Sequence, residues 1–266
     1  MGDRRQSIQL RIMQYRQERK AFYRKVYIIA SILILVSLLL WILIVLPFTG
    51  SQNSLMDYYI FAFPLLFAAL ILIMAFVMSN ALRFLVPANW IMVICIVLCI
   101  TFGMMWAVLE STWVTMIICA IIVFVVVLVF LIIGAYIPGD LTLHVMILFV
   151  FSIVFFIGSI FFLMWGILAD IYFSVWIYMA LIALMVLMFI IYHAQTIHGG
   201  RYAEMRLNDY LLAALMIYHD YVILYLLMLF VYTAYIQATV IKVHASEGSV
   251  HDCTFCDRNV TAVSIS

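Results

Sequence analysis

The stretch STWVTMIICAIIVFVVVLVFLIIGAYIPG, Ser111 to Gly139, contains no charged side chain and decides the fold class. About 20 apolar residues in a helix cross the hydrocarbon core of a bilayer, so this stretch is long enough for one crossing. It is continuously apolar, whereas the strands of a membrane barrel alternate apolar and polar residues. The pattern therefore predicts a membrane-spanning α-helix near 113–137.

The rest of the chain repeats this pattern. With 70% hydrophobic and 9% charged residues, the composition is typical of integral membrane proteins. Other uncharged runs cover 26–56, 58–82, 84–109, 141–169 and 171–200, and a last run from 210 to 241 is interrupted only by Asp220. Proline and glycine residues, which favour loops, indicate where the helices within these runs begin or end. The result is seven predicted helices near 26–46, 58–81, 90–109, 113–137, 142–165, 172–194 and 210–238.

These helices predict an all-α integral membrane protein, built as a seven-transmembrane-helix bundle. The chain is expected to divide into a basic N-terminal arm (1–25), a membrane domain (26–238) and a C-terminal tail (239–266). We expect the lipid bilayer to be its main partner and expect no nucleic acid, no cofactor and no enzymatic activity. The compartment is expected to be the endoplasmic reticulum or Golgi, with the plasma membrane as the alternative.

Lysine and arginine residues are unevenly distributed. If the arm is cytoplasmic, Arg83, Arg201 and Arg206 lie on the same side, whereas Lys242 and Arg258 lie on the other. Cytoplasmic segments carry an excess of these residues, so we predict a cytoplasmic N-terminus and a lumenal or extracellular C-terminus. The arm either only sets this topology or also attracts anionic lipids. Its basic residues are Arg4, Arg5, Arg11, Arg16, Arg19, Lys20, Arg24 and Lys25.

Two features of the predicted tail suit a lumenal or extracellular location. Asn259 begins an Asn-Val-Thr sequon, a candidate glycosylation site, and Cys253 and Cys256 form a CxxC pair that an oxidising compartment would favour as a disulfide. This pair, together with His244 and His251, lacks the spacing of an established zinc module. We therefore expect no metal site in the tail.

A carboxylate interrupts the last apolar run, in the stretch MIYHDYVIL, Met216 to Leu224. Asp220 lies ten residues beyond Tyr210, which places it about 15 Å along the predicted helix and inside the hydrocarbon layer. A charged group at the bilayer centre costs about 2.5–3.5 kcal/mol, and such residues commonly mark ion or proton pathways. The structural alternative is a protonated Asp220 that only locks two helices together through a hydrogen bond.

Few polar residues can serve as the partner of Asp220. His219 is adjacent in sequence but points about 100° away around the helix. His193, at the end of the sixth predicted helix, is therefore the better candidate. Arg83 follows the second predicted helix, where it either snorkels to the lipid headgroups or serves, like His219, as a secondary residue of the site.

Two segments of the chain resemble the signature of the Bax inhibitor family, and specifically its lifeguard branch. They are HAQTIHGGRY, His193 to Tyr202, and NDYLLAALMIYHDYVILYLLML, Asn208 to Leu229. Weaker matches are RKVY, Arg24 to Tyr27, and TFGMMWAVLES, Thr101 to Ser111. The resemblance covers nearly the whole span from 20 to 238.

This resemblance implies a seven-helix protein of intracellular membranes that suppresses apoptosis and lets calcium leak down its gradient. It also implies partners among apoptosis-regulating or calcium-handling membrane proteins. In the family, two aspartates on the sixth and seventh helices share a proton and act as a pH-dependent latch or calcium site. The second aspartate corresponds to Asp220.

The first acid of that latch is replaced in this chain. The family motif Asp-Thr-Gln reads His193-Ala194-Gln195 here, so the pair would be a histidine and an aspartate. A charged histidine attracts a carboxylate, whereas two carboxylates repel, so the titration would be governed by the imidazole. Imidazole is also a poor calcium ligand, so we expect at most a weak Ca²⁺ site at Asp220, with Ca²⁺ as the permeant ion.

Three alternatives remain open at the level of sequence. The first is a non-conducting membrane scaffold or regulator that binds partner proteins. The second is a seven-helix zinc hydrolase that uses His193, His198, His219 and Asp220, although no HExxH motif supports it. The third is a receptor, which only the number of predicted helices suggests.

Overall fold

In the computed structural model, the backbone is described for residues 2–48, 55–109, 111–169 and 171–262, and side chains within 5–46, 60–109, 111–169 and 171–236, apart from those of 7 and 172. These residues form helices and connecting turns, without a strand. The helices are α1 (Gly2–Phe48), α2 (Leu55–Met78), α3 (Asn80–Phe84), α4 (Ala88–Gly103), α5 (Met105–Leu109), α6 (Trp113–Tyr136), α7 (Val145–Ala169), α8 (Tyr172–His198) and α9 (Tyr210–Ala262). The prediction of an all-α chain is confirmed.

Six of these helices, within the described residues, are long and apolar enough to cross a membrane. Their candidate spans are Ile8–Leu46, Ile60–Met78, Trp113–Tyr136, Val145–Ala169, Phe173–His198 and Tyr210–Ile236. Many of their large apolar side chains are exposed, and on a soluble protein such a surface would aggregate. The chain is therefore a multi-pass membrane protein by length and composition.

The third predicted helix, near 90–109, is broken into α4 and α5 at Met104. The 16 residues of α4 extend about 24 Å, which is less than the roughly 30 Å of a bilayer core. The break follows Gly103, where an added Cβ would lie 2.8 Å from Cγ of Leu66 on α2. Glycine therefore permits close packing against α2 at this point, and it also weakens the helix.

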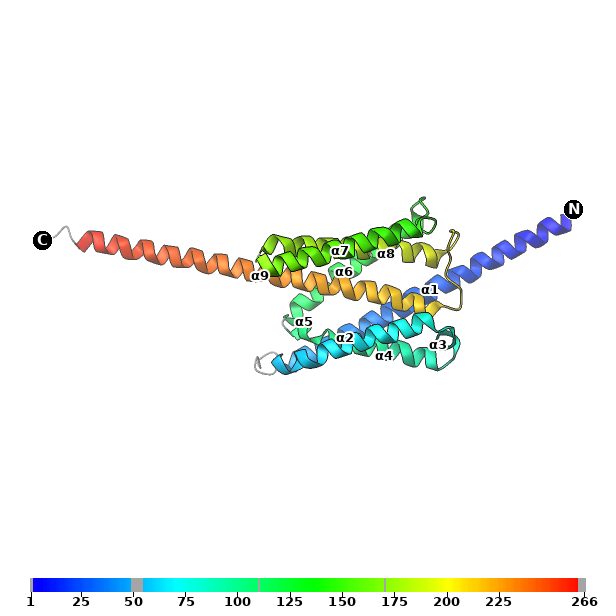
Figure 1. Cartoon of the computed structure of the whole chain (residues 1–266), viewed down its shortest axis with the longest axis horizontal. Helices are drawn as coiled ribbons and strands as arrows, with labels where there is room; N and C mark the ends of the chain where they lie inside the picture. Colours follow the sequence, from blue (N-terminus) through cyan, green and yellow to red (C-terminus); the bar gives the residue numbers. More distant parts are fainter. Residues whose placement is uncertain (1, 49–54, 110, 170, 263–266) are drawn as a thin grey trace.

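Two helices are longer than predicted. α1 begins at Gly2 rather than near 26, and α9 continues to Ala262 rather than ending near 238. The sequence analysis placed helix ends where apolar residues stop, but arginine, glutamine and glutamate also favour helix in water. Gln14 and Glu18, for example, form a hydrogen bond one turn apart on α1. α1 and α9 project from opposite ends of the bundle (Figure 1).

The bundle is organised around α9. In Figure 1 this helix passes between a group formed by α6, α7 and α8 and a group formed by α1, α2 and α4. Its inner face buries three tyrosines, Tyr218, Tyr221 and Tyr225, each at most 1% exposed. Tyr225 stacks on Trp41 of α1 with ring centroids 5.1 Å apart, and the Tyr218 hydroxyl lies 2.9 Å from that of Ser37. These contacts fix the rotation of α9 about its axis, and hence the direction in which Asp220 points.

Candidate functional site: a buried histidine and aspartate

The structure brings His193 of α8 and Asp220 of α9 into direct contact. His193 Nδ1 lies 2.7 Å from Asp220 Oδ2, and the two side chains are only 10% and 8% exposed. This separation is that of a charge-assisted hydrogen bond, which is about twice as strong as a neutral one. The contact joins two helices of the bundle through one buried hydrogen bond.

The pair lies within the candidate membrane spans of α8 and α9, near one end of the bundle. His193 is five residues before the end of α8, which corresponds to about 8 Å, and Asp220 is ten residues, or about 15 Å, into α9. The rings of Phe189 and Tyr192 lie 6.1 Å and 5.9 Å from the imidazole, measured between centroids. Such surroundings have a low dielectric, so the state of the proton has a large effect on the attraction between α8 and α9.

Gln195 positions the end of α8 that carries His193, and the sequence analysis did not single it out as a site residue. Its side chain is 1% exposed; Nε2 donates to the Gly139 carbonyl at 2.7 Å, and Oε1 accepts from the Leu141 amide at 2.8 Å. Ala194 packs against α6 at Gly134, where an added Cβ would lie 2.7 Å from Ala194 Cβ. The motif His193-Ala194-Gln195 therefore contacts α9, α6 and the segment before α7. The sequence offered one signal for Gln195, which is that it belongs to the segment that resembles the Bax inhibitor signature.

Of the two secondary residues predicted from the sequence, only His219 lies close enough to the pair to interact with it electrostatically. Arg83 Nη1 lies 3.4 Å from Asp209 Oδ1, and Nη2 binds Asn80, so Arg83 is engaged away from the pair. His198 contacts α1, with Nδ1 3.2 Å from the Tyr27 hydroxyl. His219 is half-buried on α9 and forms no hydrogen bond to either residue of the pair. The structure thus pairs His193 with Asp220 and separates Arg83 and His198 from them.

Metal ligands do not gather in the part of the chain that the structure describes. Among those residues, no group of three His, Cys, Asp or Glu side chains is close enough to hold a metal ion. Cys95, Cys99 and Cys119 are free thiols on α4 and α6. The predicted sequon at Asn259 and the Cys253–Cys256 pair lie outside the described side chains.

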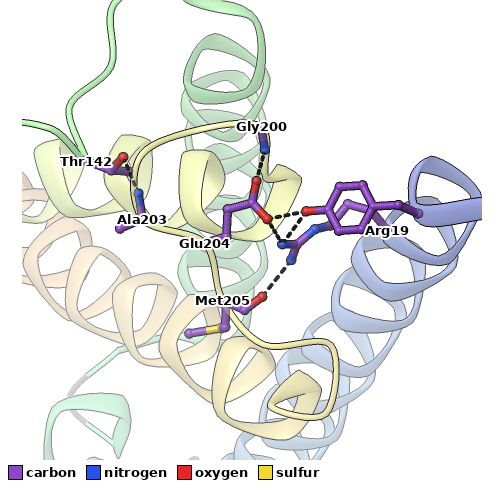
Figure 2. Close-up of polar contacts among 7 residues, drawn as sticks. Arg19, Thr142, Gly200, Ala203, Glu204 and Met205 are labelled. Atoms are coloured by element: carbon purple, nitrogen blue, oxygen red, sulfur yellow. Dashed lines mark hydrogen bonds and ion pairs between the residues drawn. The ribbon is translucent and has the colours of Figure 1, made fainter. Parts of the chain in front are cut away.

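A second polar cluster, which the sequence analysis missed, fastens the segment between α8 and α9 to α1 (Figure 2). Arg19 Nη2 lies 2.5 Å from Glu204 Oε2, and Nη1 donates to the Met205 carbonyl at 2.7 Å. The Glu204 carboxylate also accepts hydrogen bonds from the Tyr15 hydroxyl and from the Gly200 amide. Partial burial favours a higher pKa for Glu204, but these hydrogen bonds and the Arg19 charge together lower it. Glu204 is a single acid in a loop, and nothing in the sequence indicated that Arg19 is its partner.

The segment between α6 and α7 packs beside the same cluster. Asp140 Oδ1 accepts from the Thr142 hydroxyl at 2.6 Å, and Asp140 Oδ2 accepts from the Tyr202 amide at 3.0 Å. The Thr142 hydrogen bond, together with those from backbone amides, lowers the pKa of Asp140 against the opposing effect of desolvation. Arg201 binds the carbonyls of Ile137 and Pro138. Arg19 and Arg201 are among the arginines that the sequence analysis placed on one side of the membrane. Arg19 binds the segment between α8 and α9, and Arg201 binds the segment between α6 and α7.

Comparison of the chain with protein-family models, with curated proteins and with solved structures finds no match.

Proposed function

We propose that this chain is a calcium-permeable, pH-sensitive leak channel, or a regulator of such a leak, in the endoplasmic reticulum or Golgi membrane, and that it has an anti-apoptotic role. The observation that carries the proposal is the buried contact between His193 and Asp220. The resemblance to the Bax inhibitor family supplies the ion and the biological role, because that family uses an acid pair on the corresponding two helices. Its partners would then be membrane proteins that regulate apoptosis or handle calcium.

The proposal includes seven crossings with the N-terminus in the cytoplasm. Six helices have the length of a membrane span, and α4 followed by α5 would supply the seventh, interrupted, crossing. Interrupted spans are tolerated where they are packed against protein. Val93, Ile96 and Ile100 of α4 are buried against neighbouring helices, which supports this assignment. The basic N-terminal part of α1 supports the cytoplasmic location of that end.

In the proposed mechanism, the proton on His193 controls how tightly α8 and α9 are held together. With the imidazole charged, the pair is an ion pair in a low-dielectric layer and the pathway is closed. Loss of that proton leaves a neutral imidazole beside the carboxylate, so the attraction between opposite charges is lost and the helices separate more readily. Ion flux is therefore expected to rise with pH. A single carboxylate makes at most a weak calcium site, so Ca²⁺ would pass the pair rather than remain bound to it.

Calcium efflux from reconstituted vesicles tests this proposal. The flux is measured across a range of pH for the parent, for His193→Asp and for Asp220→Asn. Asp209→Asn is the matched control, since it removes another buried carboxylate, 7% exposed, that pairs with Arg83 instead. We expect the pH dependence to change in both pair variants and to persist in the control.

Two other outcomes are informative. Identical flux curves for the parent and the pair variants would show that the pair is not the gate. Negligible flux in the parent, with recovery in His193→Asp, would support the non-conducting regulator instead. Metal analysis of the purified protein addresses the zinc hydrolase alternative, for which stoichiometric zinc is required.

A further inference from the structure

Two cavities lie beside α1, at the end of the bundle where α8 ends. The first is a basic pocket of about 670 Å³ between the N-terminal part of α1 and the turn at 198–200. The second is an apolar groove of about 250 Å³ between α1, from Tyr27 to Ile34, and α6, from Phe124 to Tyr136. His198 lines both cavities.

The basic pocket presents several cations that have no counter-charge. Three exposed cations line it and form no hydrogen bond or ion pair within the described part of the chain: Arg11, Arg16 and Lys20. Arg19 also lines it, with a side chain only 7% exposed. No acid is among the described residues that line it, and Glu204, which contacts this wall, is engaged by Arg19. The pocket therefore has a surplus of positive charge.

Arg19 retains one unsatisfied donor in this wall. Its two terminal nitrogens bind Glu204 and Met205, but its buried Nε has no hydrogen-bond partner. Nε faces Gly199, where an added Cβ would lie 2.6 Å away and where φ is 73°. A buried donor without a partner costs about 1–3 kcal/mol, and guanidinium groups are well suited to phosphate oxygens. An anionic ligand at this wall would be attracted by the charge of the Arg19 guanidinium.

The two cavities follow one another along α1. His198 lies between them, stacked on Tyr23 at 4.7 Å between ring centroids and 3.2 Å from the Tyr27 hydroxyl. From Arg19 to Ile34 the helix rises about 22 Å, and the part of α6 that lines the groove is about 18 Å long. One leaflet of the hydrocarbon core is about 15 Å thick. A molecule with an anionic head and an acyl tail would fit this arrangement in length and in polarity.

We propose that α1, α6 and the turn at 198–200 form a binding site for an anionic phospholipid with a phosphomonoester headgroup, such as a phosphorylated inositol. The headgroup occupies the basic pocket, because a phosphomonoester carries between one and two negative charges at neutral pH. An acyl chain occupies the apolar groove, which is why a lipid and not a free phosphate is the ligand. The site is independent of ion conduction by His193 and Asp220.

Titration calorimetry of the full-length protein in detergent tests this proposal. The probes are dioctanoyl phosphatidylinositol bisphosphate, dioctanoyl phosphatidylcholine and soluble inositol trisphosphate. We expect the phosphorylated lipid to bind about tenfold more tightly than either of the others, because only this probe engages both cavities.

Matched variants separate the site from general electrostatic attraction. Arg16→Gln with Lys20→Gln removes two cations from the pocket, whereas Arg5→Gln with Arg24→Gln removes two exposed cations of α1 outside it. The pocket pair is expected to weaken binding about tenfold, and the control pair much less. Equal weakening by the two pairs would overturn the headgroup site.

The groove is tested separately by filling it. Ser31→Trp places an indole in the groove, whereas Ile32→Trp places one on an adjacent, exposed position of α1 that does not line it. Ser31→Trp is expected to bring the affinity for the lipid down to that for inositol trisphosphate, and Ile32→Trp to leave it unchanged. If inositol trisphosphate binds the parent as tightly as the lipid does, or if both tryptophan variants bind equally, the lipid assignment is wrong.

Discussion

At the scale of single residues, a few polar contacts in apolar surroundings connect the helices and loops of this chain. The contact between His193 and Asp220 is 2.7 Å long and almost entirely buried. Arg19 and Glu204 form a second contact, in which the carboxylate is more accessible, with 27% of its side chain exposed. Because burial differs, removal of one partner is expected to have a larger effect in the first contact than in the second.

His193→Leu is expected to lower the free energy of unfolding by about 3 kcal/mol, because it leaves a buried carboxylate without a partner. Asp220→Leu is expected to cost less, since the partner that it leaves buried is an imidazole, which can be neutral, rather than a carboxylate. The double variant is expected to recover much of the loss, as apolar residues can replace a buried pair. Thermal unfolding of the four proteins in detergent forms a double-mutant cycle; additive losses would contradict an interaction between the two side chains.

The contact of Glu204 with Arg19 predicts a pH dependence. The pKa of Glu204 is lowered in the folded state from its ordinary value of 4.5, so ionisation of this group stabilises the fold above that value. The contribution is lost as pH falls through the lowered pKa. Unfolding of the parent and of Glu204→Gln is therefore expected to differ at pH 7 and to converge in acid. Glu18→Gln, on the exposed face of α1, should show little difference at either pH.

At the scale of elements, glycines determine how closely some helices approach. Gly134 of α6 lies against α8, where an added Cβ would be 2.7 Å from Ala194 Cβ and 2.8 Å from the Ile191 carbonyl oxygen. Gly158 of α7 has more room, since its nearest neighbour would be Leu181 Cδ1 at 3.6 Å. Gly134 therefore brings α6 against the turn of α8 that carries His193, whereas Gly158 does not limit its interface.

Gly134→Ala is expected to destabilise the protein by about 1–3 kcal/mol, because α6 and α8 must move apart. Gly158→Ala is the matched control and is expected to be neutral or stabilising by up to about 1 kcal/mol, since alanine favours helix. Thermal unfolding and calcium flux are the measurements. If the two variants are equally stable, the close approach of α6 and α8 at Gly134 does not determine the stability of the protein.

At the scale of the whole molecule, the number of crossings determines where the two ends lie. Six long apolar helices and the interrupted pair α4 and α5 can place the ends on opposite sides, and α1 and α9 do project from opposite ends of the bundle (Figure 1). The loops fastened by Arg19 and Arg201 lie together at the end from which the N-terminal part of α1 projects. This shared end is the one that we propose faces the cytoplasm.

The proposed topology, with seven crossings, predicts that the sequon at Asn259 lies in the lumen when the protein is expressed in the endoplasmic reticulum. Treatment with an endoglycosidase is then expected to reduce the apparent mass of the parent but not that of Asn259→Gln. Protease added to intact microsomes should remove a tag from the N-terminus and spare one at the C-terminus. Removal of both tags would contradict an odd number of crossings.

The sequence by itself determined the helical membrane class, the approximate positions of most long helices and the presence of an acid within the last one. These properties follow from local composition, because a run of apolar residues has to bury its backbone as a helix in lipid. Only the tertiary structure decided that α4 ends at Gly103, that Gln195 supports the end of α8, and that Arg19 binds Glu204. These features depend on the rotation and separation of helices far apart in the chain. Packing sets this rotation and separation. A helix that is hydrophobic on all sides has no single apolar face, so its sequence pattern does not determine either of them.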